Sequence, residues 1–392
     1  MPRFRPHDLI VPSALSFGAM FAVGAFGRAL MSAVIPIEAF DLLGSARNVS
    51  LLYFGVAAAN LLASFAVPAL IHAFRRRRVY VLAILIGVMA PLLVGLDTVA
   101  TLTLGALLRE VGAIALLVTQ NLYIMDHIRR RDFVRSEPLR LFFGAAAWGF
   151  GPALGVVIHQ DIGPWVAFGA AAAFMLVELV WFRVMNIADM ALVAPRAAKP
   201  RNPMRFIARY WSQPRLRLAY AIAFSRSCWW VLLTVYGPIY MIETGAGDTA
   251  GGYLVSAGNM LLFLVLVFGL IARKIGVRKV IVWALLLSGL GTLVIAGVYP
   301  SPWLGAAFFV VAAIGASALD AVGGIPFLRA VRARERAEMT LVYVTFIQMS
   351  QLVPAAVFAI LLSFFDLPAI FVAMSALLIW TAWIARWVPK SM

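Results

Sequence analysis

The sequence predicts an all-α membrane protein with twelve transmembrane helices in two six-helix bundles. Three observations predict this fold class. The chain is 63% hydrophobic and only 13% charged, whereas a soluble domain is about one quarter charged. Apolar segments of membrane length recur along the whole chain, and the connections between them alternate between strongly basic and nearly uncharged. The short alternating strands that are typical of a membrane barrel do not occur in the sequence.

Each apolar segment is long enough to cross a bilayer, for which a helix needs about 20 residues. The first segment is longer than the apolar core of a cleavable signal peptide and lacks a cleavage site, so we expect it to remain as a span. One long connection, 186–215, is rich in Pro and Arg and predicts a cytoplasmic linker between an N-terminal bundle at 1–185 and a C-terminal bundle at 216–392. The expected spans are 10–36, 50–73, 79–97, 99–125, 138–159, 163–185, 216–242, 250–272, 279–299, 302–327, 339–364 and 367–388.

The basic residues predict the orientation of the chain. Of its 33 lysines and arginines, Arg47 lies on an outer connection and Arg28, Arg109 and Arg226 lie within spans. All the others fall on, or beside, connections that share one side with the N-terminus. Because basic connections stay in the cytoplasm, we expect a multi-pass protein of the cell's inner (plasma) membrane with both termini cytoplasmic. The net charge of +16 then reflects topology and contact with the lipid bilayer, and no nucleic-acid partner is expected.

The sequence contains no pattern typical of a metal site or a catalytic centre. Cys228 is the single cysteine, which excludes an internal disulfide and a zinc site of cysteines. The four histidines are scattered without ligand spacing. His159 lies at the end of a predicted span, where we expect a solvated structural role. No nucleophile has a base at a typical spacing, so we expect no enzymatic activity, no cofactor and no metal, and a monomer.

The two halves of the sequence repeat one another. The tetrapeptide AFGR ends at Arg28 in the first span, and AFSR ends at Arg226 in the seventh. Asn60 in the second span likewise has a counterpart, Asn259, in the eighth. Two halves of six spans in the same orientation predict parallel repeats about an axis along the membrane normal.

Three motifs point to a known family. The connection after the eighth span reads GLIARKIGVRK, the fourth span carries REVGA around Arg109, and the fifth carries GFGPALG. With these motifs the chain resembles the major facilitator superfamily over essentially its full length. The superfamily's loop motif reads roughly G-x-x-x-D-[RK]-x-G-x-[RK]-[RK], and here Arg273 replaces the acid. The resemblance implies a gating loop at the matching positions Gly269, Lys274, Gly276, Arg278 and Lys279.

The resemblance also implies that spans 1, 4, 7 and 10 line a central cavity. A charged residue near the middle of a bilayer costs roughly 2.5–3.5 kcal/mol unless it pairs or faces water. The charged residues away from the ends of the four cavity spans are Arg28, Arg109, Glu110, Arg226 and Asp320. The exception among buried charges is Glu178 in span 6, for which we expect a structural role beside Arg183.

Two of these arginines suit an anion. A guanidinium binds a carboxylate or phosphate through a planar fork and keeps its proton. The repeat would bring Arg28 and Arg226 to opposite walls of the cavity, which is similar to the arginines of organophosphate exchangers in the same superfamily. In the packing alternative, Glu110 or Asp320 neutralises each arginine and the pairs only hold the helices together.

Further residues complete the predicted site. Residues i and i+11 of a helix differ in direction by about 20°, so Gln120 shares a face with Arg109. Trp230 offers an aromatic wall, Asn259 is half of the repeated pair, and Gln348 lies in a polar stripe on span 11; hydrogen bonds between helices are the alternative for such residues. Glu110 and Asp320 are equal candidates for the proton carrier.

These features favour a secondary active transporter that moves a small organic anion by alternating access, with protons or a counter-anion as the coupled species. A proton-coupled multidrug exporter is the first alternative and draws on Arg109 and on the glycines of GFGPALG. A non-transporting membrane receptor or scaffold is the second, and it predicts that all charges within the spans are paired.

Overall fold

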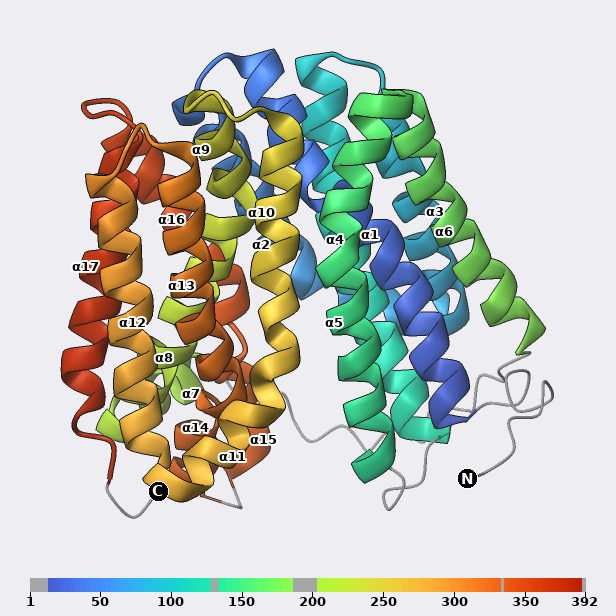
Figure 1. Ribbon diagram of the computed structural model, residues 1–392. Coiled ribbons are helices and arrows are strands. Elements are labelled where there is room, and N and C mark those ends of the chain that lie inside the picture. Colours follow the sequence, from blue (N-terminus) through green and yellow to red (C-terminus); the bar gives the residue numbers. More distant parts are fainter. Residues whose placement is uncertain (1–12, 128–132, 186–202, 333–334, 390–392) are drawn as a thin grey trace, which may run out of the picture. The chain divides into compact units, whose positions relative to one another are not determined.

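The computed structural model describes residues 13–127, 133–185, 203–332 and 335–389, and every regular element in these ranges is a helix (Figure 1). Twelve of its helical stretches are long and apolar enough to cross a membrane. The predicted all-α class and the predicted number of spans are therefore confirmed, and the chain is a multi-pass membrane protein. Most of the predicted linker, residues 186–202, lies outside the described residues.

The chain forms two compact units. Unit 1 comprises Met1–Leu192 together with Asp248–Ser256, and unit 2 comprises Val193–Gly247 and Ala257–Met392. The helices of unit 1 are α1 (Ala14–Leu43), α2 (Ala46–Phe74), α3 (Arg76–Val94), α4 (Val99–His127), α5 (Phe133–Val157), which continues as a π-helical turn (Ile158–Ile162), and α6 (Pro164–Val184).

Unit 2 contains more breaks within its spans. The seventh span consists of α8, a π-helical turn (Leu232–Tyr236) and α9, and the eighth of α10, a 3₁₀ turn (Leu261–Leu264) and α11. The start of α10, Asp248–Ser256, belongs to unit 1. The helices are α7 (Pro203–Trp211), α8 (Pro214–Val231), α9 (Gly237–Glu243), α10 (Asp248–Met260), α11 (Val265–Ile275), α12 (Val277–Gly297), α13 (Pro302–Val322), α14 (Ile325–Ala330), α15 (Arg336–Tyr343), α16 (Phe346–Leu361) and α17 (Pro368–Ala385).

Local sequence sets the helix ends. Ser13 caps α1 through a reciprocal pair of hydrogen bonds with Ser16. Gly44 ends the same helix at a φ of 67°, a conformation that glycine adopts without steric cost. We predicted the end of the first span at about 36, but the helix continues to Leu43. Hydropathy indicates where the surface in contact with lipid ends. The end of the helix itself is set by Gly44, whose φ is positive.

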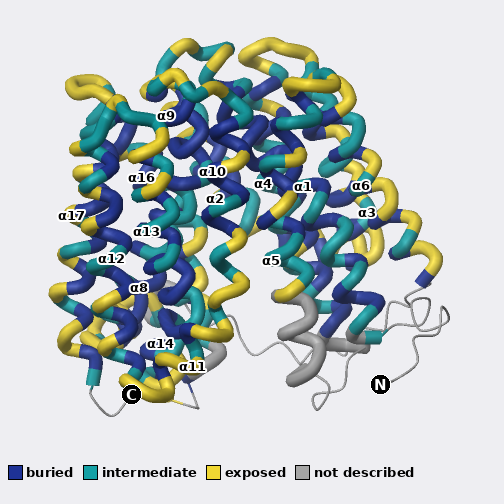
Figure 2. The backbone as a smooth tube through the Cα atoms, viewed as in Figure 1, coloured by how far each residue is buried: buried dark blue, intermediate teal, exposed yellow. Residues whose placement is uncertain are grey.

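Each unit has its own core of buried apolar residues (Figure 2), and many large apolar side chains are exposed. In unit 1, Tyr80, Tyr123 and Phe182 form an aromatic cluster with ring centroids 4.4–5.9 Å apart. In unit 2, Tyr210 and Phe327 are buried in a core of α7, α8, α14, α15 and α16. Large exposed apolar side chains cover the outside, which is what contact with lipid requires.

Glycines bring α1 and α5 into close contact within unit 1. A Cβ atom on Gly155 of α5 would collide with the backbone carbonyl of Leu30 in α1, and one on Gly151 would collide with Ala29. This small-x-x-x-small spacing lets two membrane helices approach closely. The GFGPALG segment therefore acts as a helix-packing surface.

We predict that Gly155→Ala destabilises the protein, because a backbone carbonyl cannot move aside as a flexible side chain can. Overpacking of this kind typically costs about 1–3 kcal/mol, so the melting temperature of the purified protein in detergent should fall. Gly169→Ala in α6 is the matched control, since its Cβ would meet nothing within 4 Å. Equal melting temperatures for the two variants would contradict the prediction.

Candidate functional site: ionic clusters within the two units

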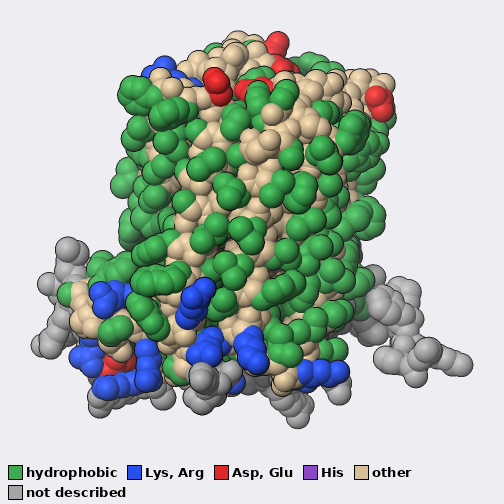
Figure 3. Space-filling model, turned by 60° about the vertical axis from the view of Figure 1, so that its left-hand side comes forward, with side chains coloured by type: hydrophobic (Ala, Val, Ile, Leu, Met, Phe, Trp, Pro, Cys, Tyr) green, Lys and Arg blue, Asp and Glu red, His purple; other side chains and the backbone are tan. Residues whose placement is uncertain are grey.

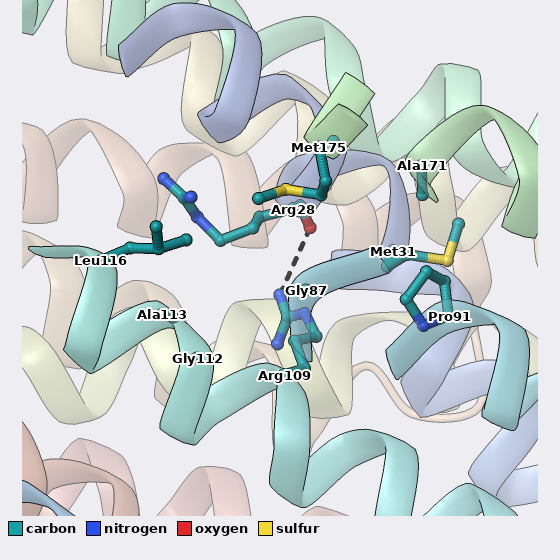
Figure 4. A pocket seen from close by; sticks show the side chains of 11 residues that line it. Arg28, Met31, Gly87, Pro91, Arg109, Gly112, Ala113, Leu116, Ala171 and Met175 are labelled. Atoms are coloured by element: carbon teal, nitrogen blue, oxygen red, sulfur yellow. Dashed lines mark hydrogen bonds between the residues drawn. The ribbon is translucent and has the colours of Figure 1, made fainter. Parts of the chain in front are cut away.

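The first cluster lies in unit 1, where α1 meets α4. One terminal nitrogen of Arg109 donates to Glu110 Oε1 at 2.6 Å. The other donates to the backbone carbonyl oxygen of Arg28 at 3.3 Å (Figure 4). The predicted residues on spans 1 and 4 are therefore in contact. Arg109 is bound on both sides, and its charge is offset by the adjacent carboxylate.

The guanidinium of Arg28 has a different environment. Within the described part of the chain it makes no ion pair and no side-chain hydrogen bond, and it extends toward Leu116 of α4 (Figure 4). A guanidinium offers five N–H donors. Among the described residues, the N–H donors of the Arg28 side chain thus have no hydrogen-bond partner.

A small cavity separates Arg28 from Arg109. Its volume is about 20 Å³, and Met31, Pro91 and Met175 are among the residues that line it (Figure 4). A cavity needs about 10–15 Å³ of such space to hold one water molecule. This void accommodates water and is too small for an organic solute.

Glu178 of α6 is a buried acid whose surroundings differ from our expectation. Its side chain is 1% exposed, and its Oε1 accepts a hydrogen bond from the Tyr80 hydroxyl at 2.7 Å. Its Oε2 is buried and has no hydrogen-bond partner in the described ranges. Arg183, the partner that we expected, is exposed. A Cβ atom on Gly24 of α1 would collide with Oε2, so the glycine makes room for the carboxyl group.

The second cluster lies in unit 2, between α8 and α13. Arg226 pairs with Asp320 through an Nη1–Oδ1 distance of 2.9 Å. The indole nitrogen of Trp230 donates to the other carboxylate oxygen at 2.8 Å. The guanidinium of Arg226 lies 5.7 Å from the centre of the Phe346 ring, within range of a cation–π contact. Arg226 and Asp320 therefore form the ion pair that the packing alternative expects, whereas Arg28 has no such pair in the part of the chain that the structure describes.

The remaining predicted residues are spread over both units. In unit 1, Gln120 is buried on α4 and its side-chain nitrogen has no hydrogen-bond partner within the described residues. In unit 2, Asn259 is buried near the end of α10, and Gln348 is half-buried on α16. Their grouping with the arginines into one substrate site stays a prediction.

The predicted gating loop joins α11 to α12. Gly269 and Lys274 lie in α11, and Gly276 connects the helices at a φ of 92°, which explains the glycine of the motif. Arg278 and Lys279 begin α12, and Arg278 donates to the backbone carbonyl oxygen of Arg386 at 3.4 Å.

Sequence reasoning missed a polar cluster at the other end of unit 1. His159, which we expected to be solvated, is 7% exposed, and its Nε2 lies 2.7 Å from Glu38 Oε1 of α1. Gln160 donates to Asp248 at the start of α10 at 2.6 Å. Glu38, the adjacent pair His159 and Gln160, and Asp248 lie far apart in sequence and belong to no shared motif, so only the packing of their helices brings them together.

The fold can be compared with known proteins. No model of a protein family and no curated protein matches the sequence. Solved structures match over nearly the whole chain. The nucleoside transporter NupG is 10% identical with a TM-score of 0.72, and the match covers 95% of this chain and 98% of that one. The peptide transporter POT in complex with sulfate is 13% identical with a TM-score of 0.75 and coverages of 95% and 93%, and a bacterial homologue of the iron transporter ferroportin in its inward-facing state is 15% identical with a TM-score of 0.69 and coverages of 96% and 98%. The chain has the major facilitator fold.

Within this major facilitator fold, the buried carboxyl of Glu178 depends on Tyr80. We predict that Tyr80→Phe lowers stability, because it leaves Oε1 buried without a donor. Such a loss typically costs about 1–3 kcal/mol, and thermal melting in detergent measures it. Tyr253→Phe on an exposed position of α10 is the control.

The double variant Tyr80→Phe with Glu178→Met should recover most of the loss, since it removes both polar partners. An unchanged melting temperature in Tyr80→Phe alone would show that the hydrogen bond does not stabilise the fold.

Proposed function

We propose that the protein is a secondary active transporter that moves a small organic anion across the plasma membrane by alternating access, coupled to protons or to a counter-anion. The observation that carries the proposal is the guanidinium of Arg28, which lies within a membrane helix and has no ion-pair partner among the described residues. The fold supports transport as the general activity, and the cluster chemistry supports an anion as the cargo.

The energetic argument rests on the cost of an uncompensated charge. A guanidinium near the bilayer centre costs roughly 2.5–3.5 kcal/mol on insertion scales. Arg109 and Arg226 recover such a cost through Glu110 and Asp320. Arg28 recovers it when an anion or water is present. A bound carboxylate or phosphate would form bidentate hydrogen bonds with its fork.

Arg226 would contribute through exchange of partners. Its present partner, Asp320, is held by a second donor, Trp230. Protonation of Asp320 would weaken the ion pair and free the guanidinium for the substrate's negative group. This exchange links proton binding to substrate binding, and the Arg109–Glu110 pair in unit 1 offers the same chemistry.

Thermal stabilisation of the purified protein by candidate ligands tests the proposal first. A ligand that binds the folded state raises the melting temperature by mass action. The screen should contain carboxylates, organic phosphates, sugars and lipophilic cations. Stabilisation by anions supports the proposed transporter; stabilisation by lipophilic cations alone would favour a multidrug exporter; no ligand effect would favour a receptor or scaffold.

We predict that Arg28→Lys and Arg226→Lys each weaken anion binding although both keep the positive charge, since lysine lacks the planar fork. The loss of a charged hydrogen bond typically costs about 1.5–3 kcal/mol, or roughly ten- to hundredfold in affinity. Titrations that follow the melting temperature measure the affinity. Arg183→Lys, at an exposed position of α6, is the control. If Arg28→Lys and Arg226→Lys both bind the anion as tightly as the parent protein, the proposed role of the arginines is contradicted.

We also predict that one of two acids carries the coupling. Glu110→Gln or Asp320→Asn should abolish substrate accumulation driven by a pH gradient in proteoliposomes. Anion binding should remain measurable, because each substitution also removes a competitor of the substrate for its arginine. If both variants accumulate substrate with the parental pH profile, neither acid carries the proton.

A further inference from the structure

A groove opens on the lipid-facing side of unit 2, between the start of α12 and the end of α17. Its volume is about 450 Å³. On the face that carries these helices, basic side chains gather at one end below a hydrophobic surface (Figure 3). The residues that line the groove are Arg278, Lys279, Val282, Trp283, Leu286 and Arg386.

The charges of the groove are uncompensated. Its three basic side chains have no ion pair among the described residues, and no acidic residue lines it. The polar contact of Arg278 is a long bond of 3.4 Å to a backbone carbonyl. Arg278 and Lys279 also occupy the first turn of α12, which no side chain caps. The positive end of a helix dipole repels cations there, so a bound anion would offset both the side chains and the helix terminus.

The other wall of the groove is apolar. Val282, Trp283 and Leu286 continue along α12 away from its basic end, and Trp283 is 47% exposed. Trp383 and Trp387 of α17 are exposed as well. Tryptophans concentrate where lipid headgroups meet hydrocarbon. The occupant must therefore combine an anionic head with an apolar chain.

We propose that this groove binds the phosphate headgroup of an anionic phospholipid from the cytoplasmic leaflet, with Arg278, Lys279 and Arg386 on the phosphate and the acyl chain along Trp283. Basic pockets at this depth suit anionic headgroups, whose attraction falls off within a Debye length of the surface. The inference uses the proposed orientation of the chain and is independent of the transported substrate.

Native mass spectrometry of the protein purified from nanodiscs tests the proposal. The triple variant Arg278→Gln, Lys279→Gln, Arg386→Gln should retain one phosphatidylglycerol fewer than the parent, with at least tenfold weaker binding at that site. The control is Arg75→Gln, Arg77→Gln, Arg78→Gln, which removes the same charge from exposed residues of unit 1 and should keep the lipid. Phosphatidylcholine should be retained by neither the parent nor the variants.

Three outcomes would overturn the proposal. The first is an equal number of bound lipids in the parent and the site variant. The second is an equal loss in the control, which would indicate a general effect of charge. The third is displacement of the lipid by inorganic phosphate as readily as by phosphatidylglycerol, which would make the groove a site for free phosphate. Circular dichroism and melting in phosphatidylcholine should show that the site variant folds like the parent.

Discussion

The cost of placing a charge in a bilayer is the constraint on which the rest of this structure depends. Water cannot solvate a guanidinium in hydrocarbon, so each buried arginine needs a protein partner, a water-filled space or a ligand. The chain meets this requirement unequally. Arg109 has Glu110, Arg226 has Asp320, and Arg28 extends from α1 without a pair in the described structure. In the proposed function, that inequality distinguishes Arg28, the binding element, from two stabilising pairs.

The partners of the charged groups also determine how the helices of each unit pack. Glycine appears in α1 where a neighbouring group needs the space of a side chain, as Gly24 does beside Glu178. Asp320 is held at both oxygens, by an arginine and by an indole. Such a carboxylate is fixed in position yet loses its ionic partner on protonation. Rigid placement together with a titratable bond is what coupling of a proton to a ligand requires.

Much of the fold could be predicted from the sequence, because hydropathy and the distribution of basic residues report directly on the membrane. The helix ends were less predictable: α1 ends at Leu43, before the left-handed Gly44, and not at the predicted residue 36. The ionic clusters could be predicted as a set of charged residues, and the packing alternative anticipated the Arg226–Asp320 pair. Which arginine would be left without an ion pair could not be predicted. Nothing in the sequence indicates that Glu178 bonds to Tyr80 or that His159 faces Glu38, since these contacts depend on three-dimensional packing.

The account stands on the claim that the position of Arg28 is open to water and to an anion. The single cysteine, Cys228, is buried, so a Cys228→Ser background allows a direct measurement. In that background, Arg28→Cys should react with a water-soluble thiol reagent, because the account places this position in contact with water. Ala25→Cys, at a position with 0% exposure, sets the rate of an inaccessible site. Reaction of Arg28→Cys no faster than Ala25→Cys would contradict the account.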